Sequence, residues 1–489
     1  MTLTTSRRGS EHSHALAASA AIGVCAIGAF AIAFLWPALS TVPYWDDLYS
    51  LIAIDVAASR GRPAVAVTGD LMGFWRPIEL MLIDVSRHID PVGYLPVKLV
   101  SFALHAAKAL AVAFLVRRLT PRLPASVPLA AGLVALAHPI AVSAIIQIDT
   151  VSEAAAAAAI AWALYCTLDA VTVTGPARRM RMIQVAVLSG LALLGKESAL
   201  PAVAALPFAG LIAARNRKEV LPALARLTIA LALICVVFLA VRYGLGFWRP
   251  QTGDDRYQIG VGFNVLRNIA TVAGSLSFFG STVSLVADHR TSAAIGFAPV
   301  IVAICLVARA ALWRRAGLVA AVDGRAVLAC VLMALAAVSA PSLAPAISEH
   351  NADLPSAAFL SVAMAITAAA AWVCGRTAMR LLAATALMAV VLGLAAMKEK
   401  AAASAQVGAA VADVRRNIST VLQSRDGVTV CIAPGEGRAY SIYRLPAERW
   451  LGEELLWARH LFPGKTISQH SAGPGCDIVT PNFPVMRTS

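Results

Sequence analysis

The chain has 489 residues, of which 59% are hydrophobic and only 14% are charged. A soluble domain carries about 25% charged residues because its surface must be wetted, so this composition excludes an ordinary soluble protein. The net charge of +14 raises the question of nucleic acid. The basic residues instead gather in short loops between apolar blocks, which is typical of cytoplasmic loops in membrane proteins and argues against a nucleic-acid partner.

Apolar blocks long enough to cross a bilayer recur along the whole chain. A span needs about 20 apolar residues, and alternating ten-residue strands typical of a β-barrel are absent. One block accommodates two short spans broken by a charged pair. We therefore predict an all-α polytopic membrane protein with about 11 transmembrane helices. The blocks lie at 15–39, 96–116, 125–148, 154–175, 183–214 (the double one), 221–241, 293–312, 326–346, 354–374 and 378–397.

The basic loops predict the orientation of these spans. Arg7 and Arg8 place the N-terminus (1–14) in the cytoplasm. The first block is longer than a signal-peptide core, so we expect a retained span, although "PALS" is also a weak cleavage site. Residues 264–286 are apolar, but a crossing there would turn two basic loops outward, so a re-entrant or interfacial segment is expected. The loops predicted to be cytoplasmic are 117–122, 176–182, 214–219, 313–325 and 375–380.

Two regions extend beyond the bare spans. The loop 40–95 is too long for a simple connection and is expected to be functional. The transmembrane domain, 15–397 with this loop, is followed by a tail, 398–489, predicted to be a small α/β domain in the periplasm. "GVTVCIAP", "KTISQHS" and "CDIVTP" read as strands, and "PAERWLGEELLWARHLF" as an amphipathic helix. Cys431 and Cys476 in this outward tail predict a disulfide.

The first polar motif is "PYWDDLYS" at the outer end of the first span. Asp46 and Asp47 beside a membrane are costly unless they are solvated or used in function. A solvated helix cap is the simpler explanation, because Asp favours first turns. Tyr49 follows them, and aromatic residues suit both a membrane interface and a sugar ring.

Further polar groups occur in the same outer loop and at the outer ends of later spans. Most have a plain alternative as loop salt bridges, solvated turns or packed residues, but their convergence on one side of the membrane favours a site. Asp149 and Glu153 are one helical turn apart and share a face. His105 and Lys108 lie within the second span, as the exception to the outward pattern. The remaining candidates are Arg76, His138 before Pro139, Lys196 with Glu197, Arg242, and Glu349 with His350.

The order and spacing of these motifs over residues 40–375 resemble the GT-C glycosyltransferases related to protein O-mannosyltransferases, especially those carrying tetratricopeptide repeats. The matching elements are the Asp-Asp pair Asp46–Asp47, the aromatic-Arg-Pro segment around Arg76 with Asp84, His105, His138–Pro139, the "GKES" element with Lys196, "VSLVADH" with Asp288, and "EHNADLPS" with Glu349, Pro355 and Ser356. Departures are Ser143 in place of a Glu, His350 and Asp353 in place of Arg and Tyr, and the absence of the repeats.

The resemblance implies a mechanism. A polyprenyl-phosphate carrier presents a sugar at the outer face of the bacterial inner membrane, and Asp46 or Asp47 acts as general base on, or orients, an acceptor hydroxyl. The lipid phosphate then leaves, and its charge needs cations, for which Lys196, Arg242 and Arg76 are candidates. Inversion at the anomeric carbon and a glycan, lipid or protein acceptor are further implications. Relatives differ in their use of a divalent cation, so a metal stays open.

Two alternative functions predict different sequence features. A transporter or flippase of lipid-linked glycan predicts inverted repeats and broken helices near the bilayer midplane. Neither feature is visible in the sequence, and the polar groups gather mostly at one face. A non-catalytic scaffold displaying the tail leaves the outward carboxylates and cations without a role.

Overall fold

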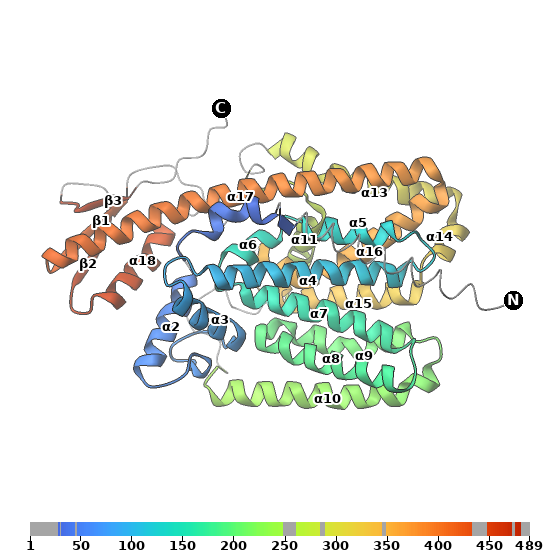
Figure 1. Cartoon of the computed structure of the whole chain (residues 1–489), viewed down its shortest axis with the longest axis horizontal. Helices are drawn as coiled ribbons and strands as arrows, with labels where there is room; N and C mark the ends of the chain where they lie inside the picture. The colour runs from blue at the N-terminus through green and yellow to red at the C-terminus, as the bar shows by residue number, and fades with distance from the viewer. Residues whose placement is uncertain are drawn as a thin grey trace.

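The computed structural model describes residues 28–29, 31–44, 46–247, 261–283, 289–344, 349–432, 447–471 and 475–480. Within these residues the fold is a helical bundle with a small three-stranded sheet at one end (Figure 1). Seven helices are long and apolar enough to cross a membrane: α4 (Leu95–Leu119), α7 (Val151–Ala170), α10 (Arg217–Gly244), α13 (His289–Trp313), α15 (Gly324–Ser342), α16 (Asp353–Cys374) and α17 (Arg376–Ser424).

The other predicted spans are also helical where the structure describes them. Residues 31–39 form the end of the first helix. Two shorter apolar segments are α5 (Ser126–Leu136) and η2–α9 (Glu197–Ala199 and Leu200–Ala213). Helix α8 (Gly175–Gly195) includes, in its first turns, the basic residues that were expected to form the loop 176–182. His138–Pro139 interrupts the third span as expected, and α6 (Ala141–Ile146) follows it. These segments correspond to the eleven expected, so the prediction of a polytopic helical membrane protein is confirmed.

Residues 264–286 were predicted not to cross the membrane. The structure forms α11 (Phe263–Ser277) there, a helix of 15 residues. At 1.5 Å per residue it is about 22 Å long, which is short of the roughly 30 Å hydrocarbon core. It packs against α15 and against η4 (Glu349–Ala352). These dimensions suit the re-entrant or interfacial position that was expected.

Four of the five basic loops meet at one end of the bundle. Arg118 pairs with Asp323 at 2.8 Å, and Arg122 donates to the carbonyl of Ala320 at 3.0 Å. Arg325 donates to the carbonyl of Ala214 at 2.9 Å, next to the loop before α10. The Arg178 guanidinium likewise reaches the carbonyl of Glu219 at 3.0 Å. These four of the loops predicted to be cytoplasmic therefore share one side of the molecule.

The long first loop folds into short helices at the opposite end of the bundle: α2 (Asp47–Ser59), η1 (Ala64–Ala66) and α3 (Pro77–Ile89). The end of α10 packs closely on this loop, because the backbone N–H of Gly69 donates to the carbonyl of Leu245 at 3.0 Å. A side chain on Gly69 would place its Cβ 2.6 Å from the carbonyl oxygen of Gly246, so only glycine fits there. Trp75 stacks on Phe238 of α10 with ring centroids 5.6 Å apart.

The last span does not end where its apolar block ends. Helix α17 has 49 residues and is about 73 Å long, more than twice the hydrocarbon thickness. Its outer part carries the C-terminal unit, in which β1 (Gly427–Ile432) pairs in parallel with β2 (Thr466–Ser471) and β3 (Ile478–Thr480). Helix α18 (Ala447–Leu461) covers this sheet together with α17. The expected small α/β unit is thus present, built directly on the last membrane helix (Figure 1).

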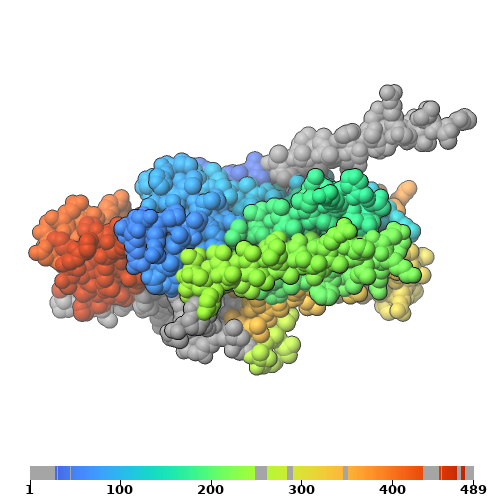
Figure 2. Space-filling view, turned by 90° about the horizontal axis from the view of Figure 1, so that it is seen from below, coloured from blue at the N-terminus to red at the C-terminus, as the bar shows by residue number. Residues whose placement is uncertain are grey.

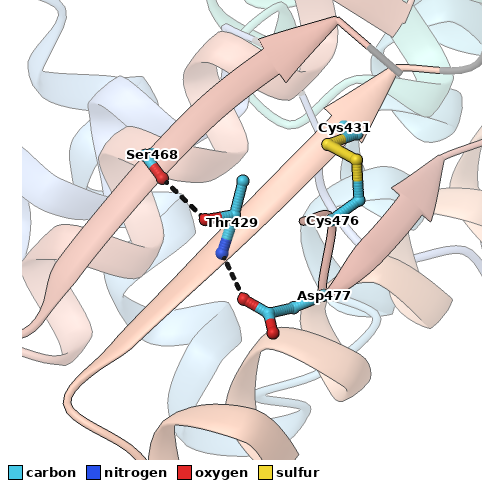
Figure 3. The surroundings of a disulfide bond; sticks show 5 residues. All are labelled: Thr429, Cys431, Ser468, Cys476 and Asp477. Atoms are coloured by element: carbon cyan, nitrogen blue, oxygen red, sulfur yellow. Dashed lines mark hydrogen bonds between the residues drawn. A yellow bond between two sulfur atoms is a disulfide. The ribbon is translucent and has the colours of Figure 1, made fainter. Parts of the chain in front are cut away.

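The disulfide predicted in the tail is formed. Cys431 of β1 is bonded to Cys476, just before β3, with Cα atoms 5.8 Å apart (Figure 3). Beside it, Asp477 accepts a 2.8 Å hydrogen bond from the backbone N–H of Thr429, and the Thr429 hydroxyl contacts Ser468 of β2 at 3.1 Å. The disulfide and the Asp477 contact tie β3 to the central strand β1, and the Thr429–Ser468 contact ties β1 to β2.

Candidate active site

The two adjacent aspartates of the first loop have different surroundings. Asp46 stands just before α2, half-buried, and its side chain makes no capping hydrogen bond to that helix. Asp47 is 1% exposed and accepts hydrogen bonds from the backbone N–H groups of Tyr44 (3.2 Å), Ile148 (2.8 Å) and Asp149 (3.1 Å). Asp47 therefore holds the connection between α6 and α7 against the start of α2.

Asp149 joins the same pair of carboxylates. Burial raises its pKa well above the ordinary value, and the nearby carboxylates of Asp47, Asp46 and Glu79 raise it further. Burial also raises the pKa of Asp47, to which the Asp149 side chain donates a hydrogen bond. These surroundings favour the protonated form of the Asp149 carboxyl. The other oxygen of Asp149, Oδ1, is buried and has no hydrogen-bond partner among the described residues.

Arg76, at the N-terminus of α3, acts electrostatically on Asp149. Its side chain is 13% exposed and lies between two carboxylates, with Nη1 3.4 Å from Glu79 Oε2 and Nε 4.0 Å from Glu197 Oε2. The guanidinium also covers the ring of Phe74 at 4.6 Å. Glu79 is fully buried and accepts a 2.8 Å hydrogen bond from the hydroxyl of Ser50 in α2. These contacts hold the guanidinium in one place.

The "GKES" element supplies the next two charges, at the turn between α8 and η2. Lys196 is 7% exposed and forms an ion pair with the buried Glu153 of α7. Glu197 lies beside Arg76, and its Oε2 is buried without a hydrogen-bond partner in the described part of the chain. Arg242 at the end of α10 acts electrostatically on Glu197 and donates to the carbonyl of Phe247 at 3.2 Å. We name these residues the outer charged cluster: Asp46, Asp47, Arg76, Glu79, Asp149, Glu153, Lys196, Glu197 and Arg242.

The two histidines proposed from the sequence lie in a second, buried polar group. His105 of α4 contacts the carbonyl of Leu136 through Nε2 at 2.9 Å. His138 accepts from the N–H of Ile140 at Nδ1 (3.3 Å), so its Nε2 carries the proton and donates to the carbonyl of Leu276 at 3.2 Å. His138 thereby connects the turn before α6 to the end of α11. Both rings are buried, and Nδ1 of His105 has no hydrogen-bond partner among the described residues.

Two lysines complete this second group. Lys108 of α4 forms a buried ion pair with Asp353, the first residue of α16. Lys400 of α17 is fully buried and donates to the carbonyl of Pro139 at 3.0 Å. A buried ion pair is stable only when each charge has a partner, and here Lys108 and Asp353 pair directly with each other. This group therefore joins α4, α16 and α17 to the turn between α5 and α6.

The other residues predicted from the sequence lie in α2, η4 and α3. Tyr49 lies in the first turn of α2 and is 45% exposed. Glu349 begins η4, which contacts α6 and α11, but its side chain lies outside the described residues, as do Trp45 and Asp288. Asp84, which ends the aromatic-Arg-Pro segment, pairs with Arg87 at 3.4 Å on a partly exposed face of α3.

Glu79 is a residue of this site that the sequence analysis did not predict. Its position three residues after Arg76 could have indicated it, because residues at i and i+3 are neighbours on a helix. For the divalent cation that the sequence left open, the described residues contain no group of three or more His, Cys, Asp or Glu side chains arranged to hold a metal.

A separate apolar cavity of about 430 Å³ lies among α5, α13, α16 and α17. Its walls are almost wholly hydrocarbon, with Val300, Phe359 and Ala386 from the last three of these helices. Phe279 forms part of its lining and packs edge-on against His138 with ring centroids 4.8 Å apart. The cavity therefore borders the second polar group.

No family model and no curated protein sequence matches this chain. Solved structures of similar fold include two of one protein. One is ArnT from Cupriavidus metallidurans in the apo state, with a TM-score of 0.56 and 14% identity over 92% of this chain and 90% of that chain. The other is the same protein bound to undecaprenyl phosphate, with a TM-score of 0.53 and 15% identity over 91% and 89% of the two chains. Likeness at these identities concerns the fold alone.

Proposed function

We propose that the chain is a membrane glycosyltransferase that transfers a sugar from a polyprenyl-phosphate donor to an acceptor on the periplasmic side of the bacterial inner membrane. The observation that carries this proposal is the outer charged cluster. Its carboxylates and cations come from four separate stretches of the sequence plus the end of α10, and they meet at the end of the bundle opposite the basic loops. Such a concentration beside a membrane is costly unless it is used.

Two oxygen atoms in the cluster support a polar ligand. Asp149 Oδ1 and Glu197 Oε2 are buried and accept no hydrogen bond from the described residues, although Glu197 Oε2 lies 4.0 Å from Arg76 Nε in an ion pair. Leaving a buried acceptor without a partner costs about 1–3 kcal/mol, so proteins rarely retain one without a role. Hydroxyl groups of a sugar or of its acceptor are donors of the kind that these two oxygens require.

Asp46 is the proposed general base. It adjoins Asp149 and Asp47 and is half-buried at the start of α2, whereas Asp47 is almost fully buried. The Asp46 carboxylate takes the proton of the acceptor hydroxyl as the oxygen attacks the anomeric carbon. The bond from that carbon to the carrier phosphate breaks, and the phosphate leaves with the electron pair. Arg76, Lys196 and Arg242 stabilise its developing negative charge.

The ion pairs made by Arg76 and Lys196 suit the proposed stabilisation of the leaving phosphate. Glu79 and Glu197 orient Arg76, and Glu153 orients Lys196, so the cations are held in place before substrate arrives. Fixed charges of this kind need no reorganisation during reaction. The apolar cavity beside His138 offers hydrocarbon-lined space for part of an isoprenoid chain. The ArnT structure bound to undecaprenyl phosphate shows that a protein of this fold binds such a carrier.

The direct test is transfer from a panel of labelled polyprenyl-phosphate sugars by the purified, lipid-embedded protein, with glycan, lipid and peptide acceptors. We expect one donor to give product and Asp46→Asn to reduce it strongly. Asp413→Asn is a matched control, because Asp413 is an exposed carboxylate on α17 paired with Arg416. Absence of transfer from every donor, or equal transfer by Asp46→Asn and Asp413→Asn, contradicts the proposal.

A further inference from the structure

The C-terminal unit contacts the residues that lead into the aspartate pair. Arg415, on the outer part of α17, binds both carboxylate oxygens of Glu454 in α18, with Nε–Oε2 at 2.6 Å and Nη2–Oε1 at 2.7 Å. The same Nη2 donates to the backbone carbonyl of Pro43 at 2.5 Å. Glu454 is fully buried, so it fixes the guanidinium in a bidentate geometry. Arg415 thus joins two parts of the C-terminal unit to the chain three residues before Asp46.

The neighbouring residues of this segment are held by α17 as well. The hydroxyl of Tyr44 is 2.7 Å from the Ser404 hydroxyl, and the ring packs with Val407 and Val411 in the core of the C-terminal unit. Thr41 lies so close to Gly408 that a side chain on the glycine would place its Cβ 2.7 Å from the Thr41 Cβ. Residues 41–44 are therefore enclosed by the last helix over more than one turn.

This segment is directly connected to the proposed active site. The backbone N–H of Tyr44 donates to Oδ2 of Asp47, whose Oδ1 in turn holds Ile148. A second contact lies further along, where His460 of α18 approaches Asp55 of α2 at 3.4 Å. Figure 2 shows the C-terminal residues, in red, against the first-loop residues, in blue. The C-terminal unit thus contacts both ends of the stretch that contains α2.

We propose that Arg415 is a positioning residue for transfer: held by Glu454, it fixes the Pro43 carbonyl and thereby places Asp46 and Asp47. The inference rests on the proposed function and assigns the C-terminal unit a part in the active site. A general base must come within hydrogen-bond reach of its proton, and a displacement of about 1 Å far from the chemistry can cost roughly a hundredfold in rate. A loop that supports such a base needs its own fixed partners.

The test compares Arg415→Met, Arg415→Lys and the control Arg416→Met in the full-length, lipid-embedded protein. Arg416 is the next residue on the same helix, but its side chain is exposed and paired with Asp413. The methionine keeps the apolar stem of Arg415 and removes all donors. Two readouts are needed: kcat and donor KM per folded molecule, and amide hydrogen exchange of the peptide 41–50.

We expect Arg415→Met to lower kcat at least tenfold with little change in donor KM, and to accelerate exchange in 41–50. Arg415→Lys should recover part of both effects through its single ammonium donor, and Arg416→Met should match the parent. Parent values of kcat and exchange in Arg415→Met overturn the inference. If the parent transfers no sugar, the proposed function fails, and exchange in 41–50 still decides whether Arg415 holds this segment.

Discussion

The backbone N–H of Ile148 donates a 2.8 Å hydrogen bond to Oδ1 of Asp47, which lies 101 residues earlier in the chain. Asp47 thereby joins the first loop to the connection between α6 and α7. Asp149, in that connection, also contacts Asp47 through its backbone N–H and its side chain. The adjacent Asp46 is half-buried at the N-terminus of α2, and its side chain does not cap that helix. The two aspartates look equivalent in the sequence but have different surroundings. Asp47 holds the site together, and Asp46 is proposed to act as the base.

Replacement of each aspartate by asparagine should separate these roles. Asp46→Asn removes the proton acceptor and should lower kcat by about 10²–10⁴-fold without loss of thermal stability. Asp47→Asn places an NH₂ group among three backbone N–H donors, so it should also destabilise the protein by about 1–3 kcal/mol. Turnover and the melting temperature are measured on the same samples. Asp46→Asn at the parent rate, or Asp47→Asn with unchanged melting, would contradict the division.

The raised pKa of Asp149 predicts how stability changes with pH. The folded chain binds this proton more tightly than the unfolded chain, so the contribution is fully present below the ordinary pKa of 3.8 and is lost as pH rises through the folded value. Asn imitates the protonated acid as a donor. Asp149→Asn should therefore melt near the parent temperature in acid and become relatively more stable as the pH is raised. A constant difference between the two melting curves across pH argues against a proton on Asp149.

The orientation can be tested with reporter fusions. The basic loops meet at one end, and the 49-residue α17 leads away from it to the C-terminal unit. Fusions after Ser424, where α17 ends, should report a periplasmic position, and fusions within 117–122 or 214–219 a cytoplasmic one. Cytoplasmic reporter activity after Ser424 would contradict the predicted count of spans and the outward position of the cluster.

The disulfide between Cys431 and Cys476 should be present in protein isolated under oxidising conditions. Mass analysis after alkylation should show these two thiols modified only when reduction precedes alkylation. The bond closes a separation of 45 residues, so its removal in Cys431→Ser/Cys476→Ser should destabilise the C-terminal unit by about 2–4 kcal/mol. Two thiols that react freely in the untreated protein would disprove the pairing.

The sequence predicts the spans well because each must be apolar along its whole length, which is a local property. It also predicts that Asp46, Arg76 and Lys196 face one side, since orientation follows from basic loops. It does not show where α17 ends: residues 401–424 leave the apolar block but remain good helix formers, so the helix continues. Nor does it assign Glu79, or the different surroundings of Asp46 and Asp47, because these depend on contacts between distant segments.

The ion pair of Lys196 with Glu153 changes what a simple alanine variant of Lys196 would report. The sequence alone suggests that Lys196→Ala impairs turnover while the protein level stays normal. In the structure both side chains are buried, at 9% and 4% exposed, and removing one partner of a buried pair costs about 3–5 kcal/mol because a charge is left unpaired. We therefore expect Lys196→Ala to lower both turnover and the melting temperature.

A double substitution distinguishes the two effects. Lys196→Met with Glu153→Gln removes both charges and keeps similar volumes, so most of the lost stability should return. Turnover should stay low, because the cation proposed to stabilise the leaving phosphate is still missing. Melting temperature and kcat are compared for the parent, both single variants and the double variant. If turnover recovers together with stability in the double variant, Lys196 serves the fold alone and its proposed role toward the phosphate is wrong.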